Sequence, residues 1–385
     1  MRSATTSIAR WLLLLPPLLT GPGGPRASGD TPPAARRREP VTEPVSRGSL
    51  FKQQDGDFRC LAFSPDGKTL AAGPHNVAGI RLYDPMTDRE RSTFATKDTT
   101  SNSVSVMTYS PDGQTIAVGP TRAGGAALVD AATGSLRVAL EKPPSIGDHT
   151  FPTSLAYSPD GKAVACGYLS GEVVLWDAAT GHRRAILPAS LVPPNTGPSR
   201  ADVPLPVGVY DLTFTPEGAA LLWFGRGGPL RACAAADGAE RTPPIKIDRP
   251  ADLIRSPDGQ SLAVTERTGD WLDDNRRVTL WDPATWHKRS EWVSREVHNG
   301  PKALVSGGRT LAVLEDCRDL QLRDAADGHS LARLRFETIE FYECMAVSPD
   351  GRWLAIGGFC SQGFYGIIRM IEIDGKTLRP WKPRP

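Results

Sequence analysis

Four oxygen-bearing side chains lie close together in one segment of the chain, Asp270, Asp273, Asp274 and Asn275. Calcium ions prefer oxygen ligands of this kind, so this segment is a candidate metal site. The spacing does not match a calcium-binding loop, and two arginines follow directly. We therefore interpret the segment as a solvated loop and predict no bound metal.

The histidines and cysteines show no catalytic or metal-binding pattern. The six His are scattered and the six Cys include no C-x-x-C pair, so no zinc site is indicated. A G-x-S-x-G nucleophile motif is absent, and so is a glycine-rich phosphate loop. We predict no catalytic residue and no cofactor, and therefore no enzyme. Free thiols are expected, with two disulfides, Cys317–Cys360 and Cys60–Cys344, as alternatives.

The composition favours many turns and short strands. Gly (38) and Pro (35) are abundant in the 385 residues, and hydrophobic residues reach 39%. The formal net charge is only +2; residues 1–47 alone carry +4, from seven Arg against three acidic residues, which leaves −2 for the rest. A nearly neutral body argues against nucleic acid as the partner.

The first residues are typical of an export signal. Arg2 and Arg10 precede an apolar run over residues 11–19. A membrane-spanning helix needs about 20 apolar residues, so this run is too short, and a Pro-Pro pair interrupts it. We predict a signal peptide over residues 1–29, a Pro- and Arg-rich linker over 30–47, and a periplasmic or extracellular protein without stable membrane insertion. The alternative is an uncleaved leader on a cytoplasmic protein.

A string of turn-forming residues recurs along the rest of the chain. Proline fixes φ at the first central position of a turn, Asp bonds its own backbone, and Gly accepts a positive φ. The spacing of 41 to 57 residues between copies indicates seven repeat units. The Ser-Pro-Asp-Gly string or a variant of it begins at Ser64, Ser110, Ser158, Thr215, Ser256 and Ser348, with a degraded copy at Ser306.

Each unit reads as four short strands. Apolar residues alternate before the turn, as in Leu61 and Phe63, which is typical of a strand with two different faces. A continuous apolar strand follows. The third strand ends in a second recurring motif, which we call the second mark, and a fourth strand comes after it. Four antiparallel strands in about 46 residues are typical of one propeller blade. The second mark is Leu82-Tyr83-Asp84, Leu128-Val129-Asp130, Leu175-Trp176-Asp177, Leu280-Trp281-Asp282 or Leu322-Arg323-Asp324.

This pairing of Ser-Pro-Asp-Gly with Leu-Trp-Asp, repeated in order, resembles the WD-repeat β-propellers. The resemblance implies an all-β, seven-bladed propeller of four-stranded antiparallel blades over residues 48–381, followed by a tail at 382–385. It also implies that Trp176 and Trp281 pack between blades. The buried network frequent in that family is reduced here, since Ser170 stands where unit three would carry its turn Asp. A related Pro-Asp type of repeat is the alternative.

The seven blades must close into a ring, because an open sheet edge would stay exposed. Unit seven supplies three strands, so one strand must come from elsewhere. We predict that residues 48–52 complete the last blade, with Lys376–Trp381 as the alternative donor.

Loop lengths distinguish the two faces of the ring. The turns after the first and third strands are short and similar, whereas the other loops vary, and function concentrates on variable loops. Arginines and aromatics, which interface centres favour, and two Asp lie in these loops. The residues predicted to contact a partner are Arg122, Arg226, Trp271, Asp273, Asp274, Arg318, Phe359, Phe364 and Tyr365.

The resemblance implies a scaffold rather than a catalyst. We therefore predict a monomeric, non-catalytic protein-interaction module that presents its variable loops to a protein partner. The alternative is a propeller enzyme, or a binder of a small ligand or metal, that uses the central channel.

Overall fold

The computed structural model describes most of the repeat region, which belongs to one compact unit, residues 39–385. The described residues are 50–54, 57–75, 77, 79–87, 89–94, 103–120, 124–140, 142–144, 146, 150–189, 208–225, 228–268, 275–294, 300–315, 319–336, 340–360, 365–374 and 377–380.

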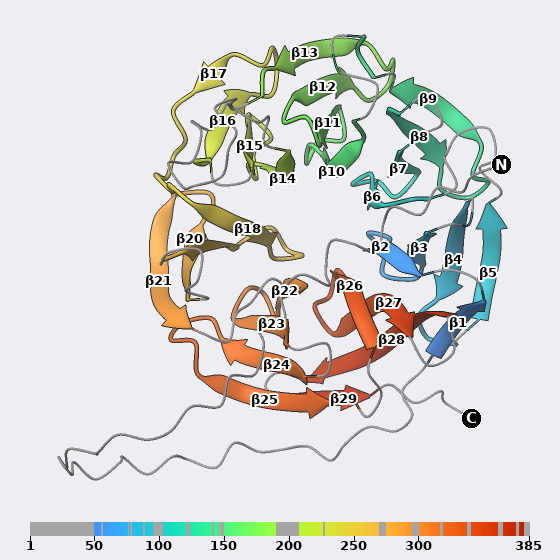
Figure 1. Ribbon diagram of the computed structural model, residues 1–385, viewed down its shortest axis with the longest axis vertical. Helices are drawn as coiled ribbons and strands as arrows, with labels where there is room; N and C mark the ends of the chain where they lie inside the picture. Colours follow the sequence, from blue (N-terminus) through green and yellow to red (C-terminus); the bar gives the residue numbers. More distant parts are fainter. Residues whose placement is uncertain are drawn as a thin grey trace, which may run out of the picture. The chain divides into compact units, whose positions relative to one another are not determined.

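Seven antiparallel sheets follow one another around a common centre, which confirms the predicted seven-bladed propeller (Figure 1). Within the described residues all regular structure is β-strand. In each blade the first strand lies innermost and the fourth outermost. The strands of blades one to three are β2 (Phe58–Phe63), β3 (Leu70–Pro74), β4 (Ile80–Asp84), β5 (Arg89–Phe94), β6 (Val106–Tyr109), β7 (Thr115–Gly119), β8 (Ala126–Asp130), β9 (Leu136–Leu140), β10 (Pro152–Tyr157), β11 (Ala163–Tyr168), β12 (Val173–Asp177) and β13 (Arg183–Leu187).

Blades four to six have the same order, and blade seven contains five strands. The strands of blades four to six are β14 (Val209–Phe214), β15 (Ala220–Gly225), β16 (Arg231–Ala234), β17 (Glu240–Arg241), β18 (Pro250–Arg255), β19 (Leu262–Arg267), β20 (Arg276–Asp282), β21 (His287–Ser294), β22 (Lys302–Val305), β23 (Thr310–Glu315), β24 (Asp319–Asp324) and β25 (Ser330–Arg335). Those of blade seven are β26 (Glu340–Val347), β27 (Trp353–Cys360), β28 (Tyr365–Asp374), β1 (Leu50–Gln54) and β29 (Thr377–Pro380).

The Ser-Pro-Asp-Gly string forms the turn between the first and second strands, as predicted. In blade one, Ser64 Oγ donates to Asp66 Oδ1 at 2.6 Å and accepts from the Thr69 amide at 3.0 Å. Gly67 has a φ of 70°, which only glycine adopts at little cost. The Asp is therefore an acceptor within the turn rather than a catalytic group.

The Asp of the second mark also has a structural role. Its side chain closes the turn after the third strand, as Asp130 Oδ1 does by accepting from the amides of Ala132 and Thr133. Its other oxygen pairs with an arginine seven residues later on the fourth strand. The pairs are Asp84–Arg91, Asp130–Arg137, Asp177–Arg184 and Asp282–Arg289.

The hydrophobic core is divided among the seven contacts between neighbouring blades, which we call seams. Each of the seven clusters of buried side chains combines residues of two adjacent blades. Trp176 is buried in the cluster between blades two and three, and Trp281 packs against the one between blades four and five. This confirms the predicted packing of both tryptophans.

At four seams, a side chain from a fourth strand packs directly on a turn glycine of the next blade. Because the glycine has no Cβ, the neighbouring side chain fills the space a Cβ would need. The pairs are Phe94 on Gly134, Val138 on Gly181, Ala185 on Gly238 and Trp292 on Gly328.

The seam between blades four and five differs from these four. The fourth strand of blade four, β17, has only two residues, and two prolines that cannot donate a ladder hydrogen bond follow soon after it. The turn position that is glycine in blades two, three, four and six holds Trp286, with a φ of 57°. Its indole packs against the cluster of this seam, so the turn itself supplies the side chain that the short strand lacks.

Both candidate segments close the ring. β1 pairs with the first half of β28, with Leu50 opposite Arg369, and β29 pairs with the second half, with Pro380 opposite Ile371. The predicted donor is confirmed, and the alternative donor proves to be a second partner of the same strand. The two ends of the ring therefore share one edge.

The cysteines in the described residues are free. Cys60 Sγ donates to the Val104 carbonyl and Cys344 Sγ to that of Phe58, so each thiol bonds the next blade rather than the other thiol. The alternative of a Cys60–Cys344 disulfide is therefore wrong. The Cys317–Cys360 alternative falls partly outside the described residues, because Cys317 is one of those not described.

Candidate functional site

Two of the predicted contact residues lie in the described part of the chain. Phe359 is on β27 and Tyr365 on β28, and the register places both at the hairpin end of blade seven. Phe341, on the neighbouring strand, lies opposite Phe359 and is 49% exposed. The remaining predictions fall outside the described residues: Arg122, Arg226, Trp271, Asp273, Asp274, Arg318 and Phe364.

Exposed apolar side chains that the sequence reasoning missed lie on the adjacent blades three and four. We call Phe151, Leu169 and Tyr210, which are 44%, 37% and 53% exposed, the seam patch. The Leu169 amide donates to the Phe151 carbonyl at 3.0 Å, and a Cβ at Gly208 would lie 3.2 Å from Leu169 Cα. Strands alternate in direction within a blade, so these residues share the face of the variable loops.

The exposure of Tyr210 follows from a β-bulge. Five of the seven innermost strands shift register at the same place, so one residue in each is left without a partner opposite. A bulge redirects the side chain of the extra residue, and bulges are frequent beside functional sites. Here the Tyr210 ring stacks on Phe224, with centroids 6.4 Å apart. The extra residues are Arg59, Thr153, Tyr210, Ala251 and Glu343.

Charged side chains gather beside two of these bulges, in blades one and seven. Arg59 bonds Asp57 and, across the seam, Glu343, both at 2.9 Å. Burial raises the pKa of Glu343, and the nearby Arg59 opposes that effect. His75 Nδ1 lies 2.6 Å from Ser103 Oγ, and burial lowers the His75 pKa. Arg59 therefore ties blades one and seven together through Glu343.

A carboxyl group bridges the seam between blades four and five. Asp211 Oδ2 accepts from the Leu253 amide at 3.1 Å, and Oδ1 accepts from the amide of Leu212 at 2.8 Å. Burial raises the pKa of Asp211 to about 7, and the charge of Asp252 adds to the shift. Asp252 in turn pairs at 3.0 Å with Lys302, whose side chain is 1% exposed.

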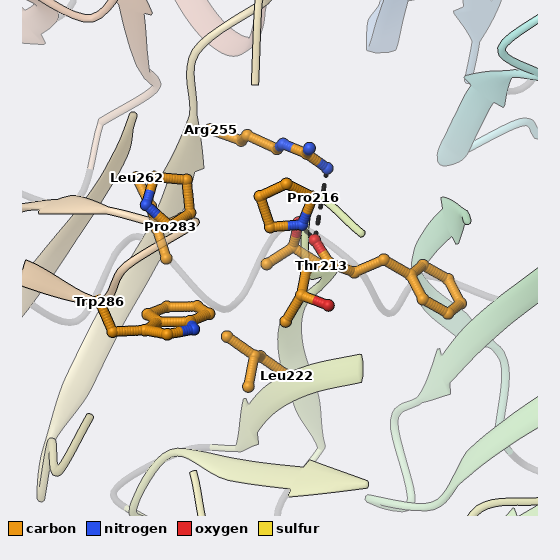
Figure 2. A pocket seen from close by; sticks show the side chains of 9 residues that line it. Thr213, Pro216, Leu222, Arg255, Leu262, Pro283 and Trp286 are labelled. Atoms are coloured by element: carbon orange, nitrogen blue, oxygen red, sulfur yellow. Dashed lines mark hydrogen bonds between the residues drawn. The ribbon is translucent and has the colours of Figure 1, made fainter. Parts of the chain in front are cut away.

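A small pocket opens at the same seam, on the opposite face, where the short turns lie. It is a shallow hollow whose space, open solvent included, is about 210 Å³. Figure 2 shows Trp286 and Leu222 on one side and Arg255 on the other, with Arg255 donating to the Phe214 carbonyl at 3.3 Å. The lining is mostly apolar, and we assign no ligand to it.

In the part of the chain that the structure describes, no three His, Cys, Asp or Glu side chains come together as a metal site. Nor do the described residues include a helix long and apolar enough to cross a membrane. Of the possible oxygen cluster, only Asn275 is described.

Comparison with known proteins identifies the class of the repeats. The family model described as "WD domain, G-beta repeat" matches residues 46–76 and 143–177, which include the Ser-Pro-Asp-Gly turns of units one and three. Together with the seven four-stranded blades, these matches confirm the predicted resemblance to the WD-repeat β-propellers.

Individual relatives resemble parts of this architecture. Telomerase protein component 1 of Rattus norvegicus is 31% identical over 154 residues, which are 40% of this chain and 5% of that protein. The crystal structure of the Myceliophteria thermophila Cps50 (Swd1) β-propeller domain matches 84% of this chain and 99% of that domain. Its TM-score is 0.64 and its sequence identity 15%, so it supports the fold alone.

Proposed function

We propose that this chain is a non-catalytic scaffold that binds a protein partner through its variable-loop face. The observation that carries the proposal is the seam patch, because Phe151 and Leu169 of blade three and Tyr210 of blade four expose large apolar side chains on the variable-loop face. Aromatic side chains on a rigid frame are typical of the residues that dominate protein interfaces. The similarity to WD repeats supports the same function.

Substitution of the patch tests this proposal. Phe151→Ser, Leu169→Ser and Tyr210→Ser together should abolish capture of a defined partner by the immobilised chain. A matched control is Leu136→Ser with Val293→Ser, since these side chains are 49% and 57% exposed on the outer strands β9 and β21. Equal capture by both variants would contradict the proposal.

The loop that contains Trp271, Asp273 and Asp274 stays a candidate second contact. Replacing residues 269–274 with a Gly-Ser linker of equal length should weaken capture without changing thermal stability. If the partner is retained in full, that loop is not part of the interface.

We propose further that the protein acts outside the cytoplasm, on the evidence of the apolar run at residues 11–19. N-terminal sequencing of the natural protein tests this. A mature terminus near residue 30 is expected, and an intact Met1 would contradict cleavage.

A further inference from the structure

We propose that Asp211 is a proton-operated latch that holds the seam between blades four and five and thereby regulates the seam patch. The inference takes the patch as the binding surface from the proposed function, but the latch itself depends only on contacts within the chain.

Asp211 occupies a position that recurs from blade to blade in the ring. It occupies the place on its innermost strand held by Cys60 in blade one, Ser154 in blade three and Cys344 in blade seven. In blade seven, the Cys344 thiol bonds across the seam to Phe58, just as Asp211 bonds across its seam to the Leu253 amide. Blade five also has a carboxyl at this position, Asp252, but Asp252 pairs with Lys302. Asp211 therefore differs from its equivalents in being a carboxyl that bonds across the seam to an amide without a cation.

The surroundings of Asp211 supply no counter-charge. The strands β10, β11 and β15, which lie against β14, contain no Asp, Glu, Lys, Arg or His. β18 brings Asp252, and at its far end Arg255, which bonds Phe214. Lys302 of blade six is held by Asp252 and by the Gly300 carbonyl. Asp211 is half-buried, and when deprotonated it is a charge that has two amide donors but no cation, next to a second carboxylate.

Deprotonation should therefore loosen this seam. The neutral carboxyl satisfies the Leu253 amide without placing a charge in the seam, whereas the ionised carboxyl is stable only if water enters. Tyr210 directly precedes Asp211, and Phe224, on which it stacks, lies opposite Asp211 in the sheet. Opening of the seam would therefore disturb the Tyr210 side of the patch, so that partner binding weakens as pH rises.

Amide hydrogen exchange at Leu253 tests the latch without any partner. If opening returns the pKa of Asp211 from about 7 to 3.8, linkage predicts about a tenfold loss of protection between pH 6 and pH 8, after correction for intrinsic rates. Leu61 is the internal control, because its position relative to Cys344 of the preceding blade matches that of Leu253 relative to Asp211. Burial raises the pKa of the Cys344 thiol well above its usual value.

Two variants make the result decisive. Asp211→Asn should abolish the pH dependence of exchange at Leu253. Asp211→Ser should do the same; it introduces the residue type of Ser154 in blade three and serves as a second test if the first variant does not fold. Equal protection at pH 6 and pH 8 in the wild type would overturn the latch, as would the same pH dependence in both variants. Failure to capture a partner would count against the proposed function and leave the exchange result standing.

Discussion

The indole of Trp292 occupies the space into which a side chain at Gly328 would project. Trp292 is on the outermost strand of blade five and Gly328 in a turn of blade six, so one ring seals the seam between two blades. The indole nitrogen also donates to the Ala325 carbonyl of blade six at 3.3 Å. The same relationship at three other seams makes it a repeated device of this ring.

Gly328→Ala should be strongly destabilising. A Cβ there would overlap Cδ2 and Cε3 of Trp292, and a φ of 75° is costly for alanine. The two effects together predict a loss of about 2–4 kcal/mol in the free energy of unfolding. Gly161→Ala is the matched control, because its φ is 71° but its Cβ would lie 3.7 Å from Pro111. If denaturant unfolding finds equal losses, the packing of Trp292 is not what requires glycine.

Removal of either closing strand should weaken the ring. Without residues 1–54, the β28 backbone from Tyr365 to Arg369 loses its outer partner, and without residues 377–385 the part from Ile371 to Asp374 does. At about 1 kcal/mol for each lost hydrogen bond, either deletion should lower the thermal midpoint by several degrees. Removing both should lower it further, as calorimetry can measure. An unchanged midpoint after the first deletion would mean that β29 alone closes the ring.

The raised pKa of Asp211 has a consequence for global stability. The native state holds this proton up to about pH 7, whereas an unfolded Asp releases it near 3.8. The contribution is complete below the unfolded value and is lost as pH rises to 7, with about 4 kcal/mol as an upper limit. Urea titrations at pH 5 and pH 8 should show this loss in the wild type but not in Asp211→Asn. A parallel loss in both proteins would assign it to another group.

Asp319 predicts the opposite dependence at acid pH. Hydrogen bonds from Arg335 lower its pKa to about 2, and Arg333 contributes. Its stabilising contribution is therefore present above about pH 4 and is lost as pH falls towards 2, an effect of about 2 kcal/mol. Asp319→Asn should remove this acid-side slope. Asp282→Asn, which breaks a more exposed pair with Arg289, is expected to change it less.

Local sequence determines much of this fold because its turns depend on few residues. Ser64, Asp66 and Gly67 suffice to specify one turn, and recurrence of the string predicted the number of blades. Trp176 was predictable for the same reason, since it belongs to a repeated mark. The two strands that close the ring could be predicted only after assuming that the seven blades form a closed ring.

The candidate site was less predictable because it depends on contacts between repeats. Tyr210 reads as an ordinary strand residue, and its exposure results from a bulge that no local string announces. Phe151 and Leu169 lie near it on the same face only because the ring places blades three and four side by side. The sequence did contain two signs that the seam between blades four and five departs from the repeat. The fourth strand of blade four is short, and Trp286 replaces a turn glycine.

The affinity of a captured partner for the ring measures the central claim most directly. Titration with purified partner at pH 6 should give a Kd at least tenfold weaker for the variant with Phe151→Ser, Leu169→Ser and Tyr210→Ser than for wild type, because an interface loses its apolar anchors. The control with Leu136→Ser and Val293→Ser should bind like the wild type. Equal affinities for all three proteins would contradict the assignment of the seam patch as the partner-binding surface.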